Sequence, residues 1–222
     1  MSSIKKIVSS SPMPPDLAKK IGINGVNEIL TVFWESYDDI KSDSTISISA
    51  TTEEDDITQI WYQKIVMRWD SRNRATCVAL NQVIPYNQYS DNTLKKRIGS
   101  KAPTIDFCFK DWDTANSYFG AECKNLYENR PDKIVRYVKT GVGNYVTGRY
   151  GSQSSEGAII GYVLSGDIPT AVKELSDEIK KEAPIMNLTR NLTIIKPQYK
   201  TRHKRRLDNK EITLHHLFFD FA

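Results

Sequence analysis

The sequence predicts an α/β fold in which a central mixed β-sheet is flanked by helices. Two strand-like runs at 103–109 and 118–126 are rich in aromatic and apolar residues and are bounded by turn formers. A continuous apolar run at 158–164 is typical of a strand covered on both faces. A helical apolar stripe precedes all three runs and consists of Ile57, Ile60, Trp61, Ile65 and Trp69.

The first fifty residues predict a leader, a helix and a short strand. Ser9–Pro15 has the composition of a flexible or polyproline-like leader. An amphipathic helix follows, with its stripe at Val26, Ile29, Leu30, Phe33 and Tyr37. The run 45–49 alternates like a strand. The next helix should begin at 51–56, with threonine caps and acids in its first turn.

The second half of the chain predicts two more helices and a strand. Pro131 suits the first position of a helix whose stripe is Ile134, Val135, Val138, Val142, Tyr145 and Val146. Gly141 and Gly143 weaken this helix by roughly 1 kcal/mol each, so we expect them to permit close backbone approach. A further helix opens at 167–169, and a strand is expected at 212–221.

Length and composition favour a single domain. The 222 residues are enough for one sizeable core. We expect a helical extension at 1–45, a catalytic core at about 50–166, and a helix, a basic loop and a strand at 167–222. The run lengths predict no membrane span and no signal peptide, which favours the cytoplasm. We therefore interpret Cys77, Cys108 and Cys123 as reduced thiols, and the sequons at Asn187 and Asn191 as chance.

The two strand-like runs carry an unusual set of charges. Asp106 lies in the first run, and Glu122 and Lys124 lie two residues apart in the second. Side chains at i and i+2 of a strand share a face, so the three groups converge if the strands are neighbours. Two carboxylates and an ammonium are what metal-dependent phosphodiester hydrolysis requires. The alternative is a structural ion pair.

An acid–x–lysine triplet alone is weak evidence, because the chain contains four of them. Three fall in polar stretches and are interpreted as solvated surface charges, at Asp39–Lys41, Glu178–Lys180 and Asp208–Lys210. Only Glu122 and Lys124 lie within an apolar strand-like run. Buried acids and lysines are rare unless they are paired or functional.

This pattern resembles the PD-(D/E)XK nuclease superfamily, which has the restriction-endonuclease-like fold. The motif is a Pro-Asp-type strand end, a short connection, and Glu/Asp-x-Lys on the next strand. Thr104 and Ile105 separate Pro103 from Asp106, so the Pro-Asp pair is not contiguous here. The resemblance covers about residues 50–166 and implies a restriction-endonuclease-like core.

The resemblance implies a Mg²⁺-dependent nuclease acting on DNA, with Mn²⁺ as a substitute metal. Asp106 and Glu122 would bind the metal, together with the backbone carbonyl of Cys123, and Lys124 would position the attacking water. A third carboxylate often comes from the preceding helix; Glu54 is the candidate and Glu28 the reserve. By fold-level analogy, the enzyme would act in bacterial restriction or anti-phage defence, as a homodimer or beside a helicase or sensor subunit.

The net charge is only +4, so the distribution of charge matters more than its sum. The basic run 196–206 contains no acid. Together with the basic residues along and at the end of the helix that begins at Pro131, it suggests a phosphate-binding surface. The candidates are Lys139, Arg149, Arg202, Lys204, Arg205 and Arg206. The alternative is a solvated loop. His203, His215 and His216 are interpreted as ordinary strand residues, because adjacent histidines in a strand point to opposite faces.

Two other functions stay open. An RNA-directed nuclease would use the same metal chemistry, and nothing in the sequence reads a 2′-hydroxyl. A non-catalytic nucleic-acid-binding or assembly subunit would keep the fold with a vestigial site. The intact set of Asp106, Glu122 and Lys124 argues against decay, because buried charges are costly to retain.

Overall fold

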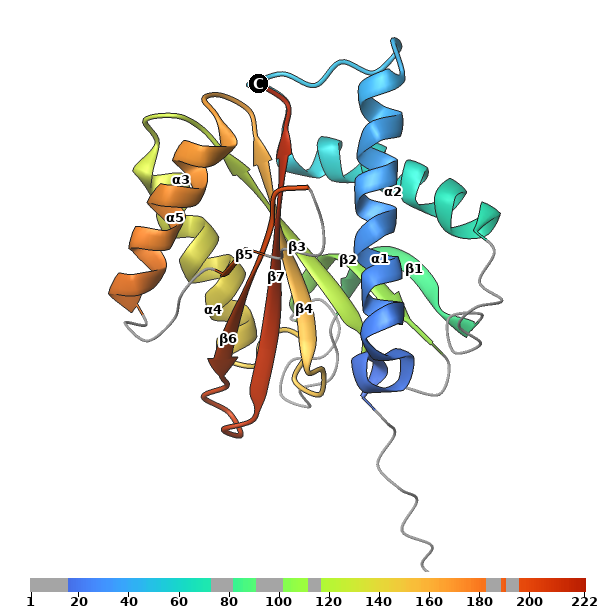
Figure 1. Cartoon of the computed structure of the whole chain (residues 1–222), viewed down its shortest axis with the longest axis vertical. Helices are drawn as coiled ribbons and strands as arrows, with labels where there is room; N and C mark the ends of the chain where they lie inside the picture. Colours follow the sequence, from blue (N-terminus) through green and yellow to red (C-terminus); the bar gives the residue numbers. More distant parts are fainter. Residues whose placement is uncertain (1–15, 73–81, 91–101, 112–116, 183–188, 191–195) are drawn as a thin grey trace, which may run out of the picture.

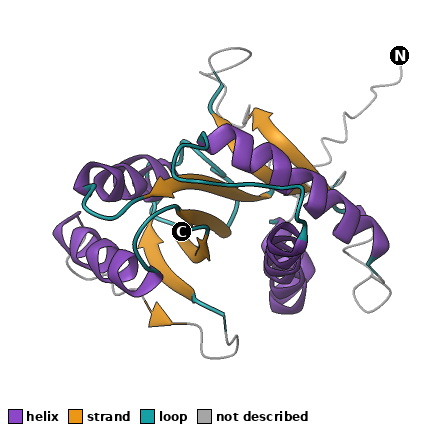
Figure 2. Cartoon of the chain, turned by 90° about the horizontal axis from the view of Figure 1, so that it is seen from above, coloured by secondary structure: helices purple, strands orange, loops and turns teal. Residues whose placement is uncertain are grey.

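A computed structural model describes residues 16–72, 82–90, 102–111, 117–182, 189–190 and 196–222. Its strands are β1 (Ile84–Ser90), β2 (Thr104–Lys110), β3 (Phe119–Leu126), β4 (Glu156–Val163), β5 (Thr189–Arg190), β6 (Gln198–Lys204) and β7 (Glu211–Asp220). Its helices are α1 (Leu17–Ser42), α2 (Glu54–Ser71), α3 (Pro131–Arg136), the π-helix η4 (Tyr137–Val142), α4 (Gly143–Val146) and α5 (Ile168–Glu182). Helices cover both faces of one sheet, which confirms the α/β class (Figures 1 and 2).

The strand order across the sheet is β1-β2-β3-β4-β7-β6-β5. Strands β1, β2 and β3 pair antiparallel, and so do β5, β6 and β7. Strand β4 lies between β3 and β7 and is parallel to both. The sheet is therefore mixed, as predicted. The central position of β4 explains its continuous apolar sequence, since Ile159 and Ile160 are both fully buried.

Helices α1 and α2 cover one face of the sheet. Most residues of the predicted stripes are buried, and Phe33 and Trp61, for example, have no exposed surface; Tyr37 and Ile60 are partly buried. Phe33 contacts Phe107 of β2, with ring centroids 5.4 Å apart, and Trp61 contacts Phe219 of β7 at 4.3 Å. Burial of each such side chain contributes about 1.5–3 kcal/mol. These contacts pack α1 against β2 and α2 against β7.

A chain segment with a helical path covers the other face and passes through α3, η4 and α4 without a break (Figure 1). Pro131 lies in the first turn of α3, as predicted. A Cβ atom at Gly141 would lie 3.2 Å from Cγ2 of Ile159 on β4. The glycine therefore permits close contact between η4 and the sheet, as expected. Helix α5 packs beside this segment through the buried Leu175 and Ile179.

Two local predictions for the stretch before α2 were wrong. Residues 45–49 form no strand, because the chain turns at Asp43, whose carbonyl accepts from the backbone N–H of Ile46 at 3.0 Å. Threonine does not cap α2 either. Its N-cap is Glu53, without a side-chain cap hydrogen bond. The Thr52 hydroxyl instead accepts from the backbone N–H of Ser49 at 2.9 Å.

The predicted basic loop is largely a strand. Residues Gln198–Lys204 form β6 and pair with β7, so 196–206 is not a free loop. Thr201 and His203 are buried, whereas Arg202 and Lys204 are exposed. This alternation is a strand pattern that the high basic charge concealed.

Several expectations concern residues outside the described ranges, namely the leader, Cys77 and both sequons. Cys108 and Cys123 are free and buried. Among the described residues, none of the helices combines the length and the apolar character needed to cross a membrane.

Candidate active site

Strand β3 places Glu122 and Lys124 on one face, as predicted. All eight residues of the strand are buried. The Lys124 ammonium donates to Glu122 Oε1 at 2.8 Å and to the Cys123 carbonyl at 2.5 Å. The Cys123 side chain lies on the other face, within the core under α1 and α2. Strand β3 therefore has a polar face with Glu122 and Lys124 and a core face with Cys123.

Asp106 joins this group from the neighbouring strand β2. The backbone ladder between β2 and β3 ends at the pair Phe107↔Ala121, so it does not include Asp106, the residue that precedes Phe107. The Asp106 carboxylate then accepts from the backbone N–H of Cys123 through Oδ2 at 2.6 Å. A side chain thus replaces a backbone partner where the ladder ends. This bond fixes the position of Asp106 relative to Glu122 and Lys124.

Glu54 is the acid that the preceding helix contributes. It lies in the first turn of α2, where a carboxylate is favoured by the helix dipole. Its Oε1 accepts from the Lys124 ammonium at 3.0 Å, and its Oε2 accepts from the backbone N–H of Asn125 at 3.0 Å. The reserve candidate Glu28 instead pairs with Arg72 at 2.6 Å.

Burial and mutual repulsion shift the acidities of this cluster. Burial, followed by the charge of Asp106, raises the pKa of Glu122 to about 8. Burial also raises the pKa of Asp106 to about 6, against the opposing effect of the Lys124 charge. Burial alone would lower the pKa of Lys124, but the surrounding carboxylates outweigh it and raise that pKa. The lysine therefore stays charged, while the carboxylates compete for a proton near neutral pH.

Two polar side chains that sequence reasoning did not assign to the site also contact it. The Gln88 amide of β1 donates to Asp106 Oδ1 at 3.0 Å. The backbone φ of Gln88 is +48°, which is uncommon for a residue with a side chain. The Tyr150 hydroxyl donates to Glu122 Oε1 at 3.4 Å. A glutamine in a polar edge strand has no distinctive sequence pattern, so no local feature pointed to it.

The other three acid–x–lysine triplets lie at the surface. Asp39 pairs with Arg68 of α2 rather than with Lys41. Lys180 lies 3.7 Å from Asp177, and Lys210 lies 3.5 Å from Asp208, with more than half of each lysine side chain exposed. Only the Glu122–Lys124 triplet is buried, which matches the interpretation from sequence.

Five of the six candidate phosphate-binding residues are exposed, namely Lys139, Arg149, Arg202, Lys204 and Arg206. Arg205 is the exception and corrects the prediction, because it is only 2 % exposed. Its Nη1 donates to the Ser152 carbonyl at 2.8 Å, and its Nη2 donates to the Ser154 carbonyl. Arg205 therefore holds the loop before β4 and is not part of an exposed basic surface.

The three histidines do not form a joint ligand set. His216 is fully buried and contacts the Tyr137 hydroxyl at 3.0 Å and the Thr201 hydroxyl at 2.8 Å. The buried His203 contacts the same threonine hydroxyl at 2.7 Å. His215 contacts Glu156 Oε2 at 2.8 Å. Their interpretation as ordinary strand residues agrees with these contacts.

Among the described residues, no three His, Cys, Asp or Glu side chains form a group that could hold a metal ion by themselves. A scan against protein-family models and searches of curated proteins and of solved structures each found no match to this chain.

Proposed function

We propose that this protein is a Mg²⁺-dependent nuclease of the PD-(D/E)XK type that hydrolyses DNA. The observation that supports the proposal is the buried contact between the Lys124 ammonium and Glu122 on β3, with Asp106 bonded to the backbone of the residue between them. Structural ion pairs are seldom buried with an excess of carboxylates, because desolvation is costly. A catalytic site has a reason to retain such charges.

The oxygen atoms of the cluster suit a magnesium ion. Glu122 Oε2 is buried and has no hydrogen-bond partner among the described residues. Burial raises the pKa values of Asp106 and Glu122, and the charge of Lys124 does not offset this effect, so a further cation would be favourable beside them. Mg²⁺ is usually held by one or two carboxylates, with water and substrate phosphate completing the shell. Asp106, Glu122 and the Cys123 carbonyl would hold it, so a group of three acids is not required.

Glu54 has a different place in the proposal. Its Oε1 accepts from the same Lys124 ammonium that contacts Glu122, and the backbone N–H of Asn125 fixes its Oε2. We therefore assign Glu54 to positioning the lysine, in place of the metal-binding role that the sequence suggested.

The chain's own residues would act mainly by position and charge. Hydrolysis adds a water oxygen to phosphorus and releases one ester oxygen as an alcohol. Lys124 stays protonated, so it would orient the water and offset the charge that develops on the phosphate. Glu54 would hold the ammonium directly, and Tyr150 would hold the neighbouring Glu122 carboxylate. When bound, Mg²⁺ would supply Lewis-acid stabilisation of the phosphoryl oxygens.

The exposed cations would contact the DNA backbone. The residues are Lys139, Arg149, Arg202, Lys204 and Arg206. Phosphate contacts of this kind position nucleic acid without reading its sequence. A role in restriction or anti-phage defence is carried over from the family resemblance by analogy.

Plasmid nicking tests the proposal. Wild-type protein should convert supercoiled plasmid to open circles with Mg²⁺ and should not do so in EDTA. Lys124→Ala should abolish nicking while leaving DNA affinity in EDTA within about twofold, because it removes a group needed for the chemical step. Glu122→Ala should abolish nicking and also weaken Mg²⁺ binding.

Lys180→Ala is a matched control, because Lys180 belongs to an exposed acid–x–lysine triplet. It should nick plasmid at the wild-type rate. Equal activity of wild type and Lys124→Ala would contradict the assigned role. A labelled RNA of the same sequence, tested in parallel, would reveal an RNA-directed nuclease instead.

A further inference from the structure

A cavity of about 810 Å³ opens on the helical face that carries η4, α4 and α5. Its walls come from η4 and α4, from the C-terminal half of α5, and from the end of β6 with the start of β7. The volume lies within the range of small-molecule sites, which is about 300–1,000 Å³. None of the proposed catalytic residues lines it, so it is separate from the candidate active site.

Four cations line this cavity, namely Lys139, Arg202, Lys204 and Arg206. Within the part of the chain that the structure describes, none of these four forms an ion pair. Glu211 is the acid among the lining residues. The excess of positive charge around a concave surface favours an anionic ligand, and guanidinium groups suit phosphate in particular.

The cavity also has an apolar part to its lining. Val138, Val142 and Val146 line it from the helical segment, and Ile179 lines it from α5. A site that combines apolar walls with several cations suits a ligand that has both a planar, uncharged ring system and a phosphate group. A nucleotide has both parts. A duplex backbone offers phosphates alone, because its bases stay stacked inside.

The cavity is close along the chain to the candidate active site. Asn144 and Thr147 line it, and Tyr150, three residues beyond Thr147, donates to Glu122. The backbone N–H of Tyr150 donates to the Asn144 carbonyl at 3.1 Å, which folds this segment tightly. Three residues span at most about 10 Å. One strand of nucleic acid could therefore contact both places.

We infer that the cavity binds an unpaired nucleotide of a single-stranded DNA segment, with its base against the valines and its phosphate on the cations. This inference rests on the proposed nuclease function and adds a substrate preference to it: DNA with a single-stranded end or gap should be cut faster than intact duplex plasmid.

Binding in EDTA tests the inference without cleavage. We would measure the Kd of a fluorescent single-stranded 20-mer, of the same strand with abasic sites, and of the matching duplex. The intact strand should bind about tenfold more tightly than the abasic strand, which is the effect of losing one well-packed base. Asn144→Trp should fill the cavity and remove that tenfold difference, because the base can no longer enter.

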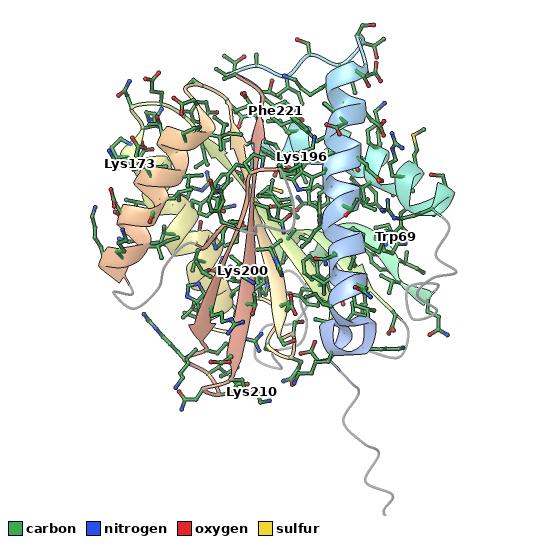
Figure 3. All side chains as sticks on the ribbon, viewed as in Figure 1. Trp69, Lys173, Lys196, Lys200, Lys210 and Phe221 are labelled. Carbon is green, nitrogen blue, oxygen red and sulfur yellow. The ribbon has the colours of Figure 1, made fainter. Side chains whose placement is uncertain are left out.

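The charge contribution is tested separately. The double variant Lys139→Ala/Arg206→Ala should reduce the salt slope for the single strand by about 1.4, at about 0.7 for each lost phosphate contact. Lys19→Ala/Lys173→Ala removes the same charge from exposed positions outside the cavity and should leave the slope unchanged. Figure 3 shows Lys173 near the top of α5, away from the β6–β7 hairpin turn at the bottom, which Lys210 marks and whose flanking residues line the cavity.

Three results would overturn the inference. The first is equal affinity of wild type for the intact and the abasic strand, a result that does not depend on any variant folding. The second is an Asn144→Trp protein that melts like wild type and keeps the tenfold difference. The third is binding of dAMP in the cavity without binding of the strand, which would assign the site to a free nucleotide. None of these results depends on nicking, so failure of the proposed nuclease activity is a separate outcome.

Discussion

Replacing Glu122 with glutamine should flatten the pH dependence of folding stability in metal-free protein. Glu122 is only 6 % exposed, and burial together with Asp106 raises its pKa from 4.5 to about 8. A carboxyl with a raised folded-state pKa binds its proton more tightly in the folded chain. Its contribution is therefore fully present below pH 4.5 and is lost as the pH rises to 8.

The size of the effect follows from the shift. The difference between 8 and 4.5 is about 3.5 pH units, and each unit corresponds to about 1.36 kcal/mol, so Glu122 costs the fold ~5 kcal/mol above pH 8. Glutamine mimics the protonated carboxyl at every pH. The two proteins should be similar near pH 4.5, and Glu122→Gln should be more stable by ~5 kcal/mol at pH 9. The raised pKa of Asp106 should add a fall in the unfolding free energy of both proteins as the pH rises from 3.8 to about 6.

Urea unfolding in EDTA between pH 4.5 and 9 measures this difference. Glu174→Gln, at an exposed position on α5, is the control and should follow the wild-type curve. Parallel curves for wild type and Glu122→Gln would refute the reasoning, because they would mean that Glu122 does not change protonation on folding. At pH 8, Mg²⁺ at ten times its Kd should restore about 1.4 kcal/mol to wild type and less to the variant.

Three further variants test the packing and the site. Gly143→Ala should stabilise the protein by up to about 1 kcal/mol in thermal melts; Gly141→Ala should show no such gain, because its Cβ would press on β4 at 3.2 Å. Arg205→Ala should lower the unfolding free energy by ~2 kcal/mol, since two buried carbonyls lose their donor, and the exposed Arg206→Ala should not. Gln88→Ala should weaken Mg²⁺ binding roughly tenfold in a titration, because the carboxylate on β2 loses the amide that orients it.

The strands of the site were predictable because their patterns are local. An acid and a lysine two residues apart in an apolar run share one face of the strand whatever surrounds them. The burial of β3 and the polar surroundings of the other triplets were also visible in the sequence. The position of Asp106 against β3 needed only that the two runs pair as neighbours, which their short connection favoured.

The remaining features depend on contacts that sequence spacing does not encode. Gln88 reaches Asp106 through a backbone conformation that nothing in its strand requires. Arg205 resembles its basic neighbours in sequence, and only the carbonyls of Ser152 and Ser154 distinguish it. The strand β6 was missed because charge was given more weight than its alternation of buried and exposed residues.

The charges around Lys124 are unbalanced in a way that connects stability with the proposed chemistry. Asp106, Glu122 and Glu54 supply three carboxyl groups, while Lys124 is the cation in direct contact. Arg136 lies 3.6 Å from Glu54 with half of its side chain exposed, so solvent screens its contribution. Backbone bonds hold Asp106 and Glu54 in place, so these two carboxylates cannot easily relax apart. The fold therefore bears a repulsion that a bound cation would relieve, so metal affinity should rise with pH while the folding stability of the metal-free protein falls.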